Sequence, residues 1–180
     1  MRVALGFRAK TGRAIAVALT RDNRVGWHGE ISLIDPRVAG TAQPYHAVME
    51  LPWPEWMRAA APFVAAIERV ATRALEQLRD DLRADGMTIS AAGIIGSADR
   101  ELGKIGNPHI RAHAAEGILF RRVLESAAKA THLRSRSFTE NEVKSEARSF
   151  QARLKALGRT AGAPWRADEK AAAAAAWLVR

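Results

Sequence analysis

Two aspartates that lie far apart in the sequence could contribute carboxylates to a metal-dependent phosphoryl-transfer site. Asp99 follows a run of small and apolar residues, and Asp168 opens an alanine-rich segment near the C-terminus. Converging carboxylates can hold two Mg²⁺ or Mn²⁺ ions about 4 Å apart, and these ions stabilise the attacking and leaving oxygens of a phosphate ester. Asp99 and Asp168 are therefore the candidate catalytic residues, with Mg²⁺ or Mn²⁺ as the cofactor. The simpler alternative for Asp168 is a helix N-terminus, where acidic side chains are stabilising anyway.

A second set of residues has the spacing of metal ligands. His109, His113 and Glu116 are separated by steps of four and three residues, which places them on one face of a helix. Imidazole and carboxylate groups together suit Zn²⁺ or Mn²⁺. The segment also begins beside the loop after a predicted strand, where open α/β sheets place their sites. We therefore predict a metal site here. The alternative is a solvent-facing pair of histidines, because the glutamate that accompanies the histidines of zinc proteases is absent.

Two cations near the N-terminus could bind phosphate. Arg8 ends an apolar run, and Lys10 begins the tight turn Lys10-Thr11-Gly12. A guanidinium group matches the geometry of a phosphate, and backbone amides beside a glycine can form an anion-binding concavity. Arg8 and Lys10 are therefore the candidate phosphate-binding residues. The alternative is a hairpin tip on the surface with no ligand.

The first thirty-five residues must position these cations, and they have the pattern of three antiparallel strands. Apolar runs at 3–7 and 13–20 are joined by a polar turn whose closing Gly12 can take a positive φ. A second turn, at 21–24, leads into a segment at 25–34 that alternates in part. Pro36 ends this third strand, because proline cannot donate a hydrogen bond to a strand ladder.

The rest of the chain alternates helices with single strands. A loop over 36–52 leads into a helix over 54–85, which Pro62 is expected to split or kink. The remaining predicted elements are a strand over 87–96, a helix over 109–129, an edge strand over 133–139, a helix from a capping box at Thr139 to about Leu157, and a helix over 166–179. This order, βββαβαβα, predicts an α/β fold with a five-stranded mixed sheet flanked by helices, in a single domain over 1–180.

Composition favours a partner rich in phosphate. The formal net charge is +9, and residues 129–180 hold eleven Lys or Arg against five Asp or Glu. Such a bias is typical of proteins that contact DNA or RNA, although a drift in composition towards arginine and alanine is the simpler explanation. The chain has no cysteine, which excludes disulfides, thiol nucleophiles and cysteine metal sites. No signal peptide and no apolar run of roughly 20 residues is present, so the sequence predicts a cytoplasmic protein without membrane contact.

Two segments resemble the ribonuclease H-like superfamily, which includes the RuvC-type Holliday-junction resolvases. The segment Leu5 to Gly12, followed by Ala14 to Val17, looks like the first hairpin of the resolvases. The segment Ala167 to Ala173 is similar to their last helix, which brings carboxylates back to the sheet. The resemblance implies a ribonuclease H-like fold over nearly the whole chain. It also implies that Arg8 stands where the family places its first metal-binding aspartate, and an arginine there repels metal ions.

Three functional hypotheses follow. The first is a ribonuclease H-like domain that binds nucleic acid or a phosphorylated ligand through an altered carboxylate site. The second is a metal-dependent nuclease or resolvase that uses Asp99 and Asp168. The third is a structural or protein-interaction module, in which the long helix and the edge strand supply the interface. The ligand and the oligomeric state are left open.

Overall fold

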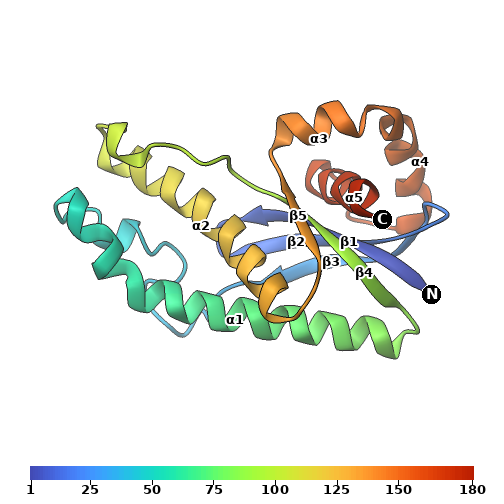
Figure 1. The fold of residues 1–180 in the computed structure, drawn as a ribbon, viewed down its shortest axis with the longest axis horizontal. Helices are drawn as coiled ribbons and strands as arrows, with labels where there is room; N and C mark the ends of the chain where they lie inside the picture. The colour runs from blue at the N-terminus through green and yellow to red at the C-terminus, as the bar shows by residue number, and fades with distance from the viewer.

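A computed structural model describes all 180 residues, and its centre is a five-stranded mixed sheet in the order β3-β2-β1-β4-β5 (Figure 1). The antiparallel strands are β1 (Arg2–Lys10), β2 (Arg13–Thr20) and β3 (Val25–Ser32). The strands that run parallel to β1 are β4 (Thr88–Ile95) and the short edge strand β5 (Ser135–Phe138). The predicted α/β fold and its mixed sheet are confirmed.

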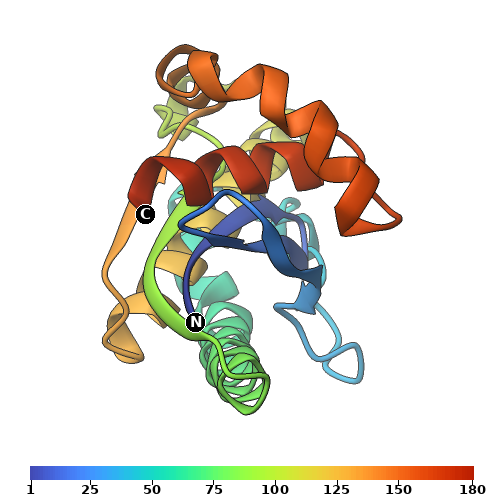
Figure 2. The ribbon, with the colours of Figure 1, turned by 90° about the vertical axis from the view of Figure 1, so that its right-hand side faces the viewer.

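Helices cover both faces of the sheet. On one face lie α1 (Trp56–Ala84) and α2 (Pro108–Ala130). On the other face, α5 (Ala167–Val179) lies directly against the strands, and α3 (Glu140–Glu146) and α4 (Gln151–Ala161) lie outside it (Figure 2). Single 3-10 turns occur at His46–Val48, Trp53–Glu55, Leu102–Lys104 and Arg148–Phe150. No helix combines the length and the apolar character that crossing a membrane requires.

One helix agrees with the sequence expectation and another differs from it. Pro62 is expected to split or kink α1, and the helix stays continuous but changes direction in its N-terminal part (Figure 1), so it is kinked rather than split. The buried side chains of Trp56 and Ile67 hold the helix on either side of the proline. The helix expected over 139–157 is interrupted by the 3-10 turn at Arg148–Phe150. This turn directs Phe150 inward, where its ring stacks on Trp177 of α5 with centroids 5.2 Å apart.

The alternation of β1 decides which side chains face the last helix. Leu5 and Phe7 belong to the core under α1 and α2, whereas Ala4 belongs to the core under α5. Because side chains alternate along a strand, Gly6 and Arg8 also face α5. The alanines at 172–176 are all buried there. Small residues on both surfaces let the helix backbone approach the sheet, and Arg8 projects just beyond this contact.

Candidate functional site

A cavity of about 340 Å³ opens where β1 and β4 end, between the sheet and the helices α3, α4 and α5. Arg8 of β1 and Ile95 of β4 contribute to it from the sheet. Its charged and polar lining residues are Arg8, Glu140, Lys144, Gln151, Asp168 and Lys170. The predicted residues Arg8 and Asp168 therefore lie in one cavity.

Arg8 is paired with two carboxylates in this cavity. Its Nη2 forms an ion pair with Glu140 on α3, and its Nε lies 3.6 Å from Oδ1 of Asp168 on α5. Lys10 Nζ lies 3.3 Å from the other carboxylate oxygen of Asp168. Only 17% of the Arg8 side chain is exposed, compared with 53% for Glu140. The charge of Asp168 is thus balanced by two cations, where a metal-dependent site would have metal ions.

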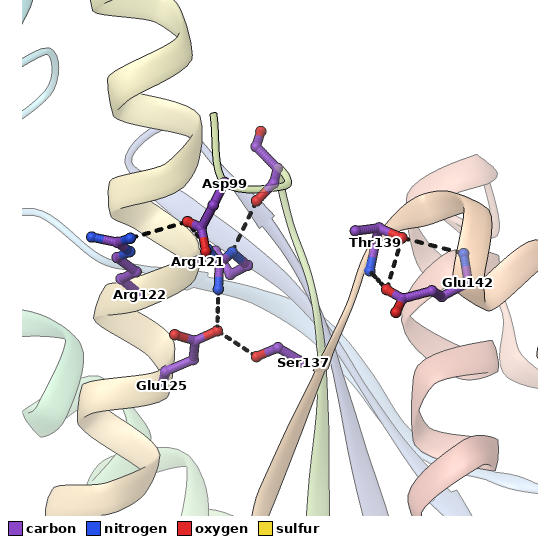
Figure 3. Close-up of polar contacts among 8 residues, drawn as sticks. Asp99, Arg121, Arg122, Glu125, Ser137, Thr139 and Glu142 are labelled. Carbon is purple, nitrogen blue, oxygen red and sulfur yellow. Dashed lines mark hydrogen bonds and ion pairs between the residues drawn. The ribbon is translucent and has the colours of Figure 1, made fainter. Parts of the chain in front are cut away.

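Asp99 lies elsewhere, in the loop after β4 (Figure 3). Its Oδ1 accepts hydrogen bonds from Arg121 at 2.6 Å and from Arg122 at 3.1 Å, both on α2. Arg121 also pairs with Glu125, which accepts a hydrogen bond from Ser137 of β5. Asp99 lines a separate cavity of about 160 Å³ that does not include Asp168. The ion pairs of Asp99 anchor this loop to α2, and the two candidate catalytic carboxylates do not share a site.

The first turn of α3 closes one side of the Asp99 cavity with a capping box. Glu142 N–H donates to the Thr139 hydroxyl, while Thr139 N–H and hydroxyl donate to the Glu142 carboxylate (Figure 3). The backbone N–H of Thr139, followed by its hydroxyl, lowers the pKa of Glu142. A lowered folded-state pKa means that this contribution is present at neutral pH and is lost as the pH falls below about 4.

We expect Thr139→Ala to lower the free energy of unfolding by about 1 kcal/mol, because an N-terminal cap is removed. Thr139→Ser keeps the hydroxyl and serves as the control, with a loss of no more than a few tenths of a kcal/mol. Urea denaturation followed by circular dichroism measures both values. Equal losses in the two variants would contradict the capping role.

A cluster of three histidines forms where α2 begins. His109 and His113 lie one turn apart on α2, as predicted, and their Nε2 atoms are 3.1 Å apart. His46, from the 3-10 turn between β3 and α1, joins them, and one ring nitrogen from each of the three residues lies within 4.8 Å of the others. The spacing of residues on α2 does not reveal His46, which comes from the loop expected over 36–52; its neighbour Tyr45 is buried and packs this loop against the domain.

Glu116 is buried and forms hydrogen bonds with one of the three histidines, His46. Its Oε1 accepts hydrogen bonds from the backbone N–H of His46 at 3.2 Å and from the ring Nδ1 at 2.8 Å. The Glu116 side chain is 1% exposed. His46 Nε2 and Glu116 Oε2 are buried and have no hydrogen-bond partner. Glu116 is therefore placed to orient His46, and three imidazoles are placed to hold a metal ion.

The comparisons with known proteins rest on structure alone. No protein-family model matches the sequence, and no curated protein matches it. Two structures of RuvC from Thermus thermophilus superpose with a TM-score of 0.54 each at 10% sequence identity. One of them holds RuvC in complex with a Holliday-junction substrate and covers 98% of this chain and 90% of that chain. The superposition on the other structure covers 97% of this chain and 90% of that chain.

The chain has a ribonuclease H-like fold. This assignment rests on the superposition, which spans 98% of this chain and so takes in nearly all of the sheet and its flanking helices. At 10% identity it carries no residue roles from RuvC to this chain. The roles of Arg8, Asp168 and the histidine cluster therefore follow from their own contacts and charges.

Proposed function

We propose that this protein binds nucleic acid by holding a backbone phosphate in the cavity at the end of β1, and that it does not cleave the strand there. The observation that carries the proposal is the position of Arg8, which lines the cavity and forms an ion pair with Asp168. The fold is shared with RuvC, of which one structure contains a Holliday junction. The net charge of +9 supports attraction to a polyanion.

A phosphate can replace the carboxylates that now pair with Arg8. Glu140 is 53% exposed, so its side chain can turn into solvent when a stronger anion arrives. Arg8 then offers the planar donor fork that suits a phosphate, and Lys10 lies on the same side of Asp168. Lys144 and Lys170 add two cations to the cavity wall. The ligand class is thus a phosphodiester of DNA or RNA.

Metal-dependent cleavage is disfavoured by the same arrangement. Mg²⁺ and Mn²⁺ bind through oxygen ligands, and only two carboxylates, Glu140 and Asp168, line this cavity. Both are paired with the guanidinium of Arg8, whose positive charge opposes a divalent ion at the same place. Asp99 is held by α2 in the other cavity. The set of carboxylates that two-metal catalysis needs is not assembled.

The test is a titration of labelled four-way-junction DNA, linear duplex DNA and RNA at 50 and 200 mM salt. We expect binding that weakens with salt, and an Arg8→Gln variant that binds about tenfold more weakly with a salt slope smaller by about one. Arg58→Gln is the control, because that side chain is 85% exposed on α1, on the opposite side of the sheet. No binding at 50 mM salt, or equal losses in both variants, would refute the proposal.

The nuclease alternative is tested on the same substrates with Mg²⁺ or Mn²⁺. We expect no cleavage product from the wild-type protein. Cleavage that disappears in the Asp168→Asn variant would instead assign a catalytic role to Asp168, and the altered-site proposal would be rejected.

A further inference from the structure

We propose that His46, His109 and His113 bind one Zn²⁺ ion, and that Glu116 acts as the partner that orients His46. This inference does not depend on nucleic-acid binding, because none of the four residues lines the cavity that contains Arg8. It differs from the sequence expectation, in which Glu116 is itself a ligand.

The three rings are close to the geometry of a tetrahedral site. Zn–N bonds of about 2.0–2.1 Å require ligand nitrogens about 3.3 Å apart. The Nε2 atoms of His109 and His113 are 3.1 Å apart. One ring nitrogen from each of the three residues lies within 4.8 Å of the others, so the widest of these pairs must close by about 1.5 Å at most. His109 and His113 are exposed and free to make this adjustment by side-chain rotation.

The hydrogen bond that His46 donates to Glu116 selects the tautomer of His46 that a metal ion needs. A carboxylate can only accept, so the Nδ1 of His46, 2.8 Å from Oε1, carries the proton. In the neutral ring the lone pair is then on Nε2, which is buried and has no partner. If the ring were doubly protonated, the same Nε2 would be a buried donor without an acceptor, which is costly. A metal ion at Nε2 satisfies this atom.

The charge balance of the buried pair supports the same conclusion. Glu116 is 1% exposed, and its one ion-pair partner is His46; no Lys or Arg pairs with it. The buried carboxylate accepts hydrogen bonds from the backbone N–H and the ring Nδ1 of His46. A divalent cation bound to the ring of His46 places a positive charge close to it. Histidine ligands that donate their second ring N–H to a carboxylate are the usual arrangement in metal sites.

The donor set selects the metal. Three imidazoles suit Zn²⁺, whereas Mg²⁺ and Ca²⁺ require oxygen ligands. Three protein ligands leave a fourth position, and the exposed sides of His109 and His113 open it to solvent. The site therefore has the ligand count of zinc centres that keep an exchangeable water. It also fastens the loop that carries His46 to the start of α2.

The test uses the full chain, stripped of metal with a chelator and then titrated with ZnCl₂ by calorimetry. We expect one Zn²⁺ per chain, and a loss of more than roughly 100-fold in affinity for His46→Gln, His109→Gln and His113→Gln. Glu116→Gln keeps an acceptor for Nδ1 but removes the charge, so its affinity should fall by about 10- to 100-fold. The control is His132→Asn, because His132 lies outside the cluster at a φ of 55° that asparagine tolerates.

Melting temperatures separate loss of binding from loss of folding. Without metal, the wild-type protein and the variants of the two exposed histidines, His109→Gln and His113→Gln, should melt at similar temperatures. Added ZnCl₂ should raise the melting temperature of the wild type and of His132→Asn, but not that of His109→Gln or His113→Gln. Cobalt substitution should give the visible absorption of a tetrahedral site in the wild type and lose it in His113→Gln. Absence of stoichiometric binding in the wild type, or equal binding in all variants, would overturn the proposal.

Discussion

We expect the Gly6→Val variant to lose at least about 4 kcal/mol of its free energy of unfolding, a large fraction of the roughly 5–15 kcal/mol of an ordinary domain. A Cβ atom at position 6 would lie 1.8 Å from the carbonyl oxygen of Ala172 and 2.7 Å from the backbone nitrogen of Ala176. Both are main-chain atoms of α5, so no side-chain rotation relieves the overlap. The helix would have to move away from the sheet and expose the core that it covers.

Thermal denaturation followed by circular dichroism, together with urea titration, measures this loss. The matched control is Gly106→Val, because no heavy atom lies within 4 Å of a Cβ placed at Gly106, and its φ is not positive. We expect that control to stay within about 0.5 kcal/mol of the wild type. A Gly6→Val variant that is as stable as the control would mean that α5 does not lie against β1 at this distance.

The second large effect concerns Asp168 and Arg8, whose substitution should change nucleic-acid affinity in opposite directions. Asp168→Asn removes the anion that pairs with Arg8 and Lys10, so we expect binding several-fold tighter than that of the wild type. Arg8→Asp removes the cation and adds a carboxylate beside Glu140 and Asp168. We expect this variant to bind at least about 100-fold more weakly, since one charged contact is lost and repulsion is added.

The control for Asp168→Asn is Asp80→Asn, which changes the net charge by the same amount on an exposed part of α1. Fluorescence anisotropy with one duplex at one salt concentration compares the four proteins. If Asp168→Asn and Asp80→Asn bind alike, the effect is one of net charge, and the cavity at the end of β1 is not where the phosphate binds.

The fold was predictable because the sequence patterns that define its strands and helices are local. Apolar runs with turn residues between them define the first three strands, and a strand that follows a crossover helix pairs parallel to its neighbour. The interruption at Arg148–Phe150 was not predictable, because the apolar pattern continues through it. In the structure, Phe150 of this turn stacks on Trp177 of α5, a contact that only the tertiary structure provides.

The histidine cluster was predictable only where neighbours in sequence are also neighbours in space. His109 and His113 share a helix face, so their spacing was enough. His46 joins them through the path of a long loop, and no local pattern reveals that path. Asp99 follows β4 as expected, but its ion pairs with Arg121 and Arg122 depend on how α2 packs against the loop, which no local pattern reveals. Element order alone did not assign Asp99 and Asp168 to different cavities.

The close approach of α5 to the sheet has a consequence for the thermodynamics of binding. Gly6 and Gly93 bring the helix main chain against β1 and β4, so the start of the helix, with Asp168, is fixed relative to Arg8 by backbone atoms. A ligand in the cavity therefore meets a preorganised backbone and orders only side chains, at about 0.5–1.5 kcal/mol for each one immobilised. Its affinity depends mainly on the free energy needed to break the ion pairs of Arg8 with Glu140 and Asp168. Changing the charges at these positions therefore changes the affinity for the ligand without altering the packing of α5 on the sheet.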